Sequence, residues 1–455
     1  MITRQLSNIT SMITGSSLVG EDKLIQGVSI DSRNILAGNL FIPIVGPNHN
    51  GHRFVQTAFE KGAVATLWQK GEPNPPSSHP VIYVEDTLKA LQILAHSYRL
   101  QLKATFIGIT GSNGKTSTKD ILHSILATKF KTQKTQGNFN NEIGVPLTLL
   151  ELDEDVEMAV IEMGMGKRGD ISFLSGLVRP NISIITNIGH AHLVNFQTLE
   201  NIAREKMDII SGMNADGLLI FNGDLDLLVS ESIRYPFQKK TFGMKDTNTI
   251  HLTSCIQEDE LQFTISDSQQ LFFLPLLGEH QAVNALSAIM VARHFHLSDR
   301  EISTGLHHTS LSGQRYELKV YKNITIINDT YKSNPESIGM ALRTLYAQKG
   351  ERKLFVMGDM FDMGEKDRFL HEQIGHELDP RKLDCIYGYG DSTSYTIRIA
   401  QTRFSPGRAV YFSEEQKLIE AIINYAKEPC TILFKASRGL QFERLIDSME
   451  KREIR

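Results

Sequence analysis

The sequence predicts an α/β protein of three domains: a central domain with a doubly wound, mainly parallel sheet, a second doubly wound domain after it and a smaller α/β domain before it. Three observations lead to this prediction. The chain has 455 residues, enough for about three domains of roughly 150 residues. From Ala104 onward, strand-length apolar runs alternate with helical patterns, which is typical of parallel sheets. A glycine-rich turn joins one such strand to a helix. We expect domains at residues 1–101, 102–310 and 311–455.

Composition narrows the class of protein. Apolar residues make up 41% of the chain and charged residues 22%, as in ordinary globular proteins. The net charge of −4 gives no basic excess for nucleic acid or an anionic membrane. No apolar run reaches the ~18 residues of a membrane span, and the first residues lack an apolar signal core. Three widely spaced cysteines fit neither a disulfide framework nor a zinc site, so we expect a reducing cytoplasm.

In the N-terminal domain we expect a weak amphipathic helix over residues 2–14, strands over 40–44 and 81–84, and helices over 54–61 and 87–98. Two polar groups stand out: residues 29–33, which include Ser32 and Arg33, and residues 46–52, which include Gly51 and His52. Arg33 could hold a phosphate through its planar guanidinium fork, although an Asp-Ser-Arg run is more often a turn or a helix cap.

The strongest local pattern begins at Ala104. A buried strand over 104–109 is followed by the loop Thr110-Gly111-Ser112-Asn113-Gly114, then by Lys115-Thr116-Ser117 and a helical pattern. The two glycines let the backbone approach an anion, and the helix N-terminus points at it. Lys115 would reach the outer phosphates of a nucleotide, and the Thr116 hydroxyl would contact Mg²⁺. The simpler alternative is a glycine-rich turn with a surface lysine, which the strand and helix on either side disfavour.

Polar residues follow the next strands. The amide-rich segment 134–142, with Gln136, Asn138, Asn140 and Asn141, is either a solvated loop or a loop that contacts substrate. Glu162 ends a strand over 156–161, where a carboxylate could bind Mg²⁺ as a hard oxygen ligand.

Two further candidates come from the following strand and helix. His192 follows a strand over 182–186, and Lys206 lies on a helix over 199–212. Taken alone, a single histidine is more often structural and a single lysine is more often a surface residue.

The remaining chain completes the architecture. Residues 239–277 alternate apolar and polar, which predicts an antiparallel edge or flap, and a long helix follows to about His294. The third domain has expected strands at 324–327, 354–357, 385–387 and 431–434, each followed by a helical pattern. It lacks a dinucleotide-binding glycine fingerprint.

These motifs together resemble the Mur ligase family over essentially the whole chain. The matching segments are residues 110–116, 162–164, 187–192, 202–206, 278–284, 313–317, 328–335, 358–371 and 435–439. The resemblance implies a Rossmann-like C-terminal domain and an ATP-dependent amide ligase of peptidoglycan precursor synthesis. It implies an acyl phosphate formed on UDP-N-acetylmuramoyl-tripeptide and attacked by the amine of D-alanyl-D-alanine. We also expect a cytoplasmic monomer that binds no nucleic acid and has no membrane span.

The resemblance also implies roles for individual residues. Catalysis would depend on Lys115, His192, Lys206 and Arg315, with Lys206 carbamylated. Two Mg²⁺ ions would be held by Thr116, Glu162, His192 and Lys206. ATP would contact the residues of the loop from Thr110 to Ser117 together with His280, Asn284, Arg315, Asp329 and Tyr331. Substrates would contact Ser32, Arg33, Gly51, His52, Gln136, Asn138, Asn140, Asn141 and Asn334.

The sequence departs from the family pattern in a few places. Ser117 replaces a usual Thr, Gln281 replaces a usual Asn, and Lys332-Ser333 replaces Asn-Ala, which adds a positive charge near the reacting groups. The lysine leaves open a related ligase with a different amine acceptor. A regulatory ATPase without ligase activity is an alternative, which the motifs around Arg315 and Asp329 disfavour. A folylpolyglutamate-like ligase is a third, which the uridine-type N-terminal domain disfavours.

Overall fold

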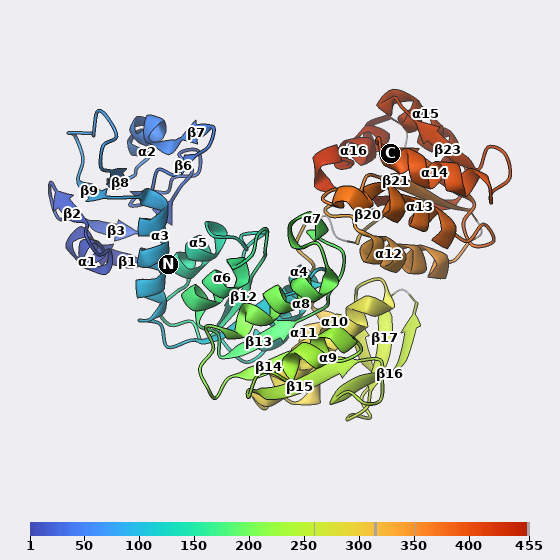
Figure 1. Ribbon diagram of the computed structural model, residues 1–455, viewed down its shortest axis with the longest axis horizontal. Helices are drawn as coiled ribbons and strands as arrows, with labels where there is room; N and C mark the ends of the chain where they lie inside the picture. Colours follow the sequence, from blue (N-terminus) through green and yellow to red (C-terminus); the bar gives the residue numbers. More distant parts are fainter. Residues whose placement is uncertain (259, 314–315, 351, 453–455) are drawn as a thin grey trace.

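The computed structural model describes residues 1–258, 260–313, 316–350 and 352–452. Its three large sheets follow one another along the chain and define an N-terminal, a central and a C-terminal unit, as Figure 1 shows. The mixed α/β architecture with mainly parallel sheets confirms the predicted fold class.

The central unit contains a nine-stranded sheet. From one edge to the other, its strands are β11 (Thr132–Lys134), β12 (Met158–Glu162), β10 (Thr105–Thr110), β13 (Ile182–Ile185), β14 (Leu218–Asn222), β15 (Gln238–Gly243), β16 (Ile250–Gln257), β17 (Leu261–Ile265) and β18 (Phe272–Leu274). The pairs from β11 to β16 are parallel, and β16, β17 and β18 pair antiparallel. The ends of β10, β12 and β13 therefore lie together at one edge.

Helices cover both faces of this sheet. The described helices and 3-10 turns are α4 (Lys115–Leu126), α5 (Gly144–Glu151), α6 (Asp170–Val178), α7 (Leu193–Phe196), α8 (Leu199–Met207), η2 (Asp208–Ile210), α9 (Asp226–Ser232), α10 (Glu279–His294) and α11 (Asp299–His307). Apolar residues of α4, α10 and α11 form the core on one face, and those of α5, α6 and α8 pack on the other. The nucleotide-loop helix α4 is thus held firmly by the core beneath it.

Two predictions for this unit were wrong in part. The segment 239–277 is antiparallel only from β16 onward, because β15 and the start of β16 extend the parallel sheet. Alternation of apolar and polar residues shows which face is buried, but it does not specify strand direction. The helix expected over 199–212 ends at Met207 and continues only as a 3-10 turn.

The N-terminal unit contains a five-stranded sheet and two short ladders. Its elements are β1 (Thr3–Gln5), α1 (Leu6–Met12), β2 (Ser17–Val19), β3 (Leu24–Gln26), β4 (Val28–Ser29), β5 (Leu40–Phe41), β6 (Val45–Gly46), β7 (His49–Asn50), η1 (Gly51–Phe54), α2 (Val55–Glu60), β8 (Ala65–Gln69), β9 (Val81–Val84) and α3 (Thr87–Arg99). The predicted helix over 2–14 begins instead as strand β1, which pairs with β3.

Helix α3 joins the N-terminal unit to the central unit. Its buried residues belong to the same apolar core as α5 and α6. The Tyr98 hydroxyl donates to the carbonyl of Leu152 at 2.8 Å, and the Arg99 Nε donates to the carbonyl of Val178 at 2.6 Å. The two units therefore share one continuous core, which fixes their relative position.

The C-terminal unit contains a six-stranded sheet with a helical layer on each face. Its elements are β19 (Glu317–Tyr321), β20 (Ile324–Asp329), α12 (Pro335–Ala347), β21 (Lys353–Gly358), η3 (Gly364–Lys366), α13 (Asp367–Glu377), β22 (Cys385–Tyr389), α14 (Thr393–Gln401), β23 (Ala409–Phe412), α15 (Glu415–Tyr425), β24 (Cys430–Lys435), η4 (Arg438–Leu440) and α16 (Glu443–Arg452). Among the described strands of this sheet, only β19 runs antiparallel.

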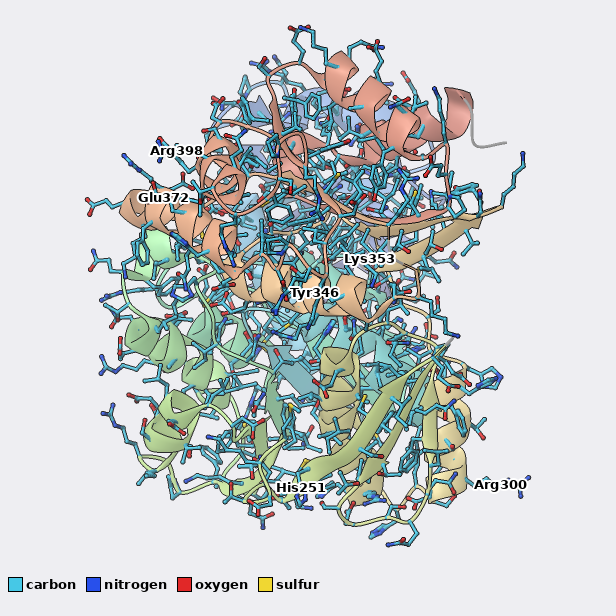
Figure 2. The ribbon with its side chains drawn as sticks, turned by 90° about the vertical axis from the view of Figure 1, so that its right-hand side faces the viewer. His251, Arg300, Tyr346, Lys353, Glu372 and Arg398 are labelled. Atoms are coloured by element: carbon cyan, nitrogen blue, oxygen red, sulfur yellow. The ribbon has the colours of Figure 1, made fainter. Side chains whose placement is uncertain are left out.

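Polar contacts join separate elements of the C-terminal unit. Arg398 Nη2 lies 2.7 Å from Glu372 Oε1, and Lys353 Nζ donates to the carbonyl of Tyr346 at 2.9 Å (Figure 2).

Among the described residues, none of the helices has the length and apolar content to cross a membrane.

Candidate active site

The nucleotide loop lies between β10 and α4. Gly111 adopts a φ of 155°, and a Cβ there would lie 1.9 Å from Thr186 Oγ1, so this position requires glycine. Gly114, with a φ of 80°, passes close to Asn284. The loop is fixed from outside, because the backbone N–H of Asn113 donates to Asn187 Oδ1 at 2.7 Å. The backbone N–H of Ser112 likewise donates to the carbonyl of Asn187 at 3.1 Å, so these two bonds hold the loop in its conformation before an anion binds.

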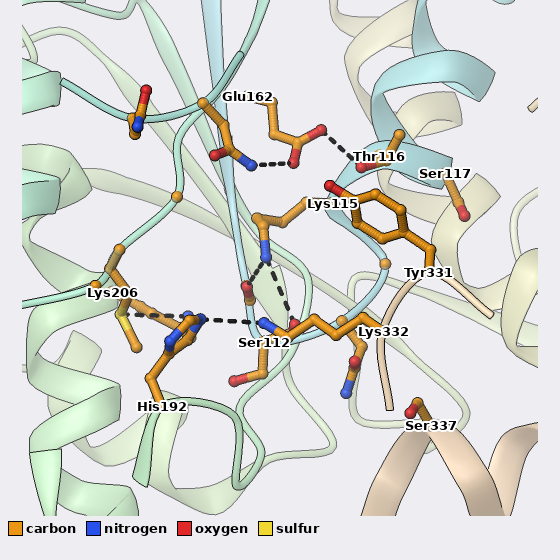
Figure 3. A pocket seen from close by; sticks show the side chains of 18 of the residues that line it. Ser112, Lys115, Thr116, Ser117, Glu162, His192, Lys206, Tyr331, Lys332 and Ser337 are labelled. Carbon is orange, nitrogen blue, oxygen red and sulfur yellow. Dashed lines mark hydrogen bonds between the residues drawn. The ribbon is translucent and has the colours of Figure 1, made fainter. Parts of the chain in front are cut away.

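Figure 3 shows the Lys115 side chain lying over this loop, where its Nζ donates to the carbonyls of Gly111 and Ser112. A lysine in this position neutralises negative charge that enters the loop. Thr110 is buried at the end of β10 and does not line the cavity, whereas Ser117 does.

A cavity of about 600 Å³ opens from the loop into the junction between the central and C-terminal units. The predicted site residues that line it are residues 111–117, Asn140, Asn141, Glu162, His192, Lys206, His280, Asn284, Asp329 and Tyr331. These residues come from segments more than 200 positions apart, and the fold brings them to one place. Arg315 lies outside the described residues.

Thr116 and Glu162 lie side by side in the cavity wall. The Thr116 hydroxyl donates to Glu162 Oε2 at 2.8 Å, and Asn140 Nδ2 donates to Glu162 Oε1 at 2.8 Å (Figure 3). Glu162 is buried, and its backbone N–H donates to Thr135 Oγ1 at 3.0 Å. A hydroxyl and a carboxylate oxygen beside a phosphate loop are the hard donors that Mg²⁺ prefers, so these residues fit that ion.

His192 and Lys206 face the opposite wall of the same cavity. Lys332 Nζ lies 3.0 Å from His192 Nε2, and Lys206 Nζ lies 3.6 Å from the Met165 sulfur. Burial lowers the pKa of His192 to about 2, with a further contribution from the charge of Lys332. Burial, followed by the charges of Lys115 and Lys332, also holds the pKa of Lys206 well below its usual range.

The unmodified His192 and Lys206 side chains supply nitrogen donors only. No group of three or more His, Cys, Asp or Glu side chains that could hold a metal occurs in the part of the chain that the structure describes. A carbamate on Lys206 would add the oxygen donors that a hard cation requires. The neutral amine that carbamylation needs is favoured by the lowered pKa of this lysine.

His280 and Asn284 begin helix α10 beside the loop. Burial lowers the pKa of His280 to about 3, and its ring lies 4.7 Å from the Tyr316 ring. Asn284 Nδ2 donates to Gln281 Oε1 at 3.2 Å, so the residue that departs from the family pattern orients the amide of Asn284.

The C-terminal unit contributes directly to the loop. Asn113 and Asn334 exchange side-chain hydrogen bonds of 3.2 and 2.9 Å, and Asn334 also caps α12 through the N–H of Ser337. The backbone N–H of His190 donates to Glu336 Oε1 at 3.1 Å. The structure therefore places Asn334 at the contact between two units, outside the cavity lining.

Most of the other predicted substrate residues lie away from the cavity, and Asn141 is the exception among those that the structure describes. Gln136 and Asn138 are exposed, and Asn141, although it lines the cavity, accepts the N–H of Gly144 at the start of α5. In the N-terminal unit, the Ser32 side chain is buried, and the exposed Arg33 pairs with Asp31 at 2.9 Å. A Cβ at Gly51 would lie 2.7 Å from the Ile44 nitrogen. Their roles in binding substrate remain predictions.

His52 has a clear structural role in its own unit. Its Nδ1 lies 2.8 Å from Asn50 Oδ1, its Nε2 accepts the N–H of Gln69 at 3.1 Å, and its ring packs edge-on against Trp68 at 4.6 Å. Both ring nitrogens thus have partners within the unit, and burial lowers the pKa of the ring.

Sequence reasoning assigned no site role to three further charged side chains, although Lys435 lies in one of the matching segments. Lys435 Nζ lies 2.8 Å from Asp329 Oδ2, Lys119 Nζ lies 3.9 Å from Glu162 Oε2, and Glu336 contacts His190. Lys119 follows Thr116 by three positions on α4, so the two side chains lie on the same face of the helix, one turn apart. This spacing is a signal that could have identified Lys119.

These observations define a nucleotide-binding α/β protein whose site is completed by a second unit. Residues 24–99 match the Mur ligase family, catalytic domain, residues 109–292 match the Mur ligase middle domain, and residues 314–438 match the Mur ligase, glutamate ligase domain. The chain belongs to the Mur ligase family, as the sequence motifs predicted.

Individual relatives cover almost the whole chain. The UDP-N-acetylmuramoyl-tripeptide–D-alanyl-D-alanine ligase of Bacillus subtilis (strain 168) is 39% identical over 454 residues, covering 99% of both chains. A crystal structure of MurF from Acinetobacter baumannii has a TM-score of 0.90 at 27% identity and covers 99% of this chain and 100% of its own. MurF from Thermotoga maritima in complex with ADP has a TM-score of 0.82 at 27% identity and covers 94% and 97%.

Proposed function

We propose that this protein is an ATP-dependent ligase that joins D-alanyl-D-alanine to UDP-N-acetylmuramoyl-tripeptide in peptidoglycan precursor synthesis. The observation that carries the proposal is the convergence of Lys115, Thr116 and Glu162 with His192 and Lys206 on one cavity. Full-length relatives that carry this activity in their names support it. We further propose a cytoplasmic monomer with domains at residues 1–101, 102–310 and 311–455.

The reaction begins between two anions. A carboxylate oxygen of the tripeptide attacks the γ-phosphorus of ATP, the bond to the β-phosphate oxygen breaks, and ADP leaves. Lys115 and the loop N–H groups hold the phosphates in line, while Thr116 and Glu162 would hold Mg²⁺. Bound Mg²⁺ ions neutralise charge on the phosphates and on the carboxylate. A carbamylated Lys206 and His192 would hold the second ion.

The second step forms the amide. The neutral amine of the dipeptide attacks the carbonyl carbon of the acyl phosphate, and the tetrahedral intermediate expels inorganic phosphate. The nitrogen loses one proton as the C–N bond forms. Asp329, Tyr331 and Lys332 approach the cavity from the C-terminal unit, so the site is complete only when this unit lies against the loop.

Phosphate release tests this function. With Mg²⁺, bicarbonate, ATP and UDP-N-acetylmuramoyl-tripeptide, release should require D-alanyl-D-alanine and should match the amide product one to one. Absence of release above background would contradict the ligase, and ATP turnover indifferent to the UDP-peptide would indicate a regulatory ATPase.

Replacing the dipeptide with other amines tests whether Lys332 changes the acceptor, and exchanging meso-diaminopimelate for L-lysine identifies the third residue of the tripeptide.

Lys115→Ala should leave the fold intact and abolish this turnover. The residue lies at the junction between loop and helix, and its ammonium donates to the loop carbonyls of Gly111 and Ser112. We expect kcat to fall by at least about 100-fold, as for other residues that stabilise charge in a transition state. A circular dichroism spectrum and a melting temperature close to those of the unaltered protein provide the control.

A further inference from the structure

A cluster of buried charges lies behind the nucleotide loop. Lys119 and Asp120, on adjacent positions of α4, both have side chains that are 0% exposed. Lys134 Nζ lies 2.7 Å from Asp120 Oδ1. Charged side chains are rarely buried completely unless they are paired. Buried charges do not add to the solubility of the helix, so this cluster must have another role.

Asp120 contacts the connection between the central and C-terminal units. Its Oδ2 accepts both the backbone N–H of Ser312, at 2.8 Å, and the Ser312 hydroxyl, at 2.7 Å. Ser312 lies between α11 of the central unit and β19 of the C-terminal unit. Hydrogen bonds to a buried carboxylate are among the stronger ones, so the connection is fastened to α4 at this point.

Lys119 extends this contact to the active site. Its Nζ lies 3.5 Å from Asp120 Oδ1 and 3.5 Å from the Ser312 hydroxyl oxygen. The same nitrogen lies 3.9 Å from Glu162 Oε2, the oxygen that accepts the Thr116 hydroxyl. One ammonium group is therefore within reach of the carboxylate of the predicted Mg²⁺ site and of the interdomain connection.

Immediately after Ser312 the backbone changes character. Gly313 is exposed and has a φ of 80°, a left-handed conformation that glycine adopts without strain. Ser312 is thus the last point at which the connection is held by a buried side chain of α4 before this glycine.

We infer that Asp120 is a positioning residue that fastens the interdomain connection to the nucleotide-binding helix, and that Lys119 links this anchor to Glu162. The link to Glu162 rests on the proposed function, because it assumes that Mg²⁺ and nucleotide bind there. A cation beside Glu162 repels the Lys119 ammonium and shifts it towards Asp120 and Ser312. Nucleotide binding therefore tightens the anchor and reduces motion of the connection.

Hydrogen–deuterium exchange on the full chain tests this inference. Removing a charged partner would leave a buried charge uncompensated, so the informative variant is the neutral Ser312→Ala. It removes one hydrogen bond to a carboxylate, and amides of residues 308–313 should exchange about tenfold faster. Ser312→Thr, which keeps the hydroxyl, should restore slow exchange. Ser310→Ala, an exposed position on the same connection, is the matched control.

The second part of the exchange experiment adds nucleotide. With Mg²⁺ and a non-hydrolysable ATP analogue, exchange at 308–313 should slow in the unaltered protein and in Ser310→Ala, but not in Ser312→Ala. In assays of phosphate release, Ser312→Ala should lower kcat with little change in the KM for ATP. Equal exchange in Ser312→Ala and Ser310→Ala would overturn the anchor. Missing phosphate release in the unaltered protein, with the exchange differences intact, would instead overturn the proposed ligase.

Discussion

Lys206 shows how burial changes what a side chain can do. The sequence presents it as an ordinary helical lysine, whereas the structure places it inside a cavity near two other ammonium groups. Its lowered pKa makes a neutral amine available, and a neutral amine is the form that reacts with carbon dioxide.

We predict that Lys206 carries a carbamate in the active protein. Incubation with ¹³C-bicarbonate should give a carbamate carbon resonance that is absent from Lys206→Arg, and Lys206→Ala should lower kcat by at least about 100-fold, the scale for loss of charge stabilisation. A near-normal rate for Lys206→Ala would refute its role in holding a metal. His251→Ala, a change on β16 outside the cavity lining, serves as the control for fold and handling (Figure 2).

His52 illustrates the opposite case, in which a predicted binding residue has a structural role. Its pKa lies below the usual 6.5, so between these two values the unfolded chain binds more protons than the folded chain. The stability that the neutral ring contributes is therefore fully present above pH 6.5 and is lost as the pH falls through the folded-state pKa.

The single tryptophan of the chain makes this measurable, because Trp68 packs against the His52 ring. Trp68 fluorescence should decrease as the ring becomes protonated, with a midpoint below pH 6.5. His52→Gln should remove this transition and weaken the pH dependence of the melting temperature between pH 7 and 5. A midpoint at or above pH 6.5 would show that the ring is not held neutral.

At the scale of elements, the nucleotide loop depends on backbone conformations that only glycine adopts comfortably. Gly111→Ala places a methyl group against Thr186 and forces a strained φ. We expect a loss of about 1–3 kcal/mol in the free energy of unfolding, together with weaker nucleotide binding. Gly176→Ala is the matched control, because Gly176 lies in α6 with open space around its Cβ.

The two substitutions should have opposite signs. Alanine is favoured over glycine within a helix, so Gly176→Ala should stabilise the protein by about 0.5–1 kcal/mol. Chemical denaturation followed by circular dichroism measures both changes, and calorimetry with ADP measures binding. Equal effects of the two variants would show that the loop conformation at Gly111 limits neither stability nor nucleotide binding.

Much of this architecture was predictable because local signals agree with it. The strand, loop and helix around Lys115 predicted the nucleotide loop, and strand ends predicted the positions of Glu162 and His192. The direction of β15 was not predictable, because partner strands are chosen by tertiary packing. The contacts of Asp120 with Ser312 and of Asp329 with Lys435 join distant segments, and a single sequence holds no local record of such pairs.

At the scale of the whole molecule, the C-terminal unit reaches the nucleotide loop through a few polar contacts. Glu336, in the first turn of α12, accepts the N–H of His190, and Asn334 pairs with Asn113. Such a contact is much weaker than the continuous core that joins the other two units, so we expect the C-terminal unit to move more easily than the N-terminal unit.

We predict that Glu336→Ala loosens this contact. The radius of gyration measured by small-angle X-ray scattering should increase, and the rate of phosphate release should fall by roughly tenfold, the usual scale for losing a hydrogen bond to a charged group. Glu420→Ala, an exposed change on α15, should leave both measurements unchanged. An unaltered radius in Glu336→Ala would show that other contacts hold the units together.

The apolar core that α3 shares with the central unit has an evolutionary consequence. The N-terminal sheet, which precedes α3, and the central sheet pack around one shared core. Neither unit can therefore be exchanged without redesigning the other. The unit that follows Gly313 carries its own interior, so recombination could replace it whole. Chimaeras cut at Gly313 should therefore give a higher yield of folded protein than chimaeras cut after α3.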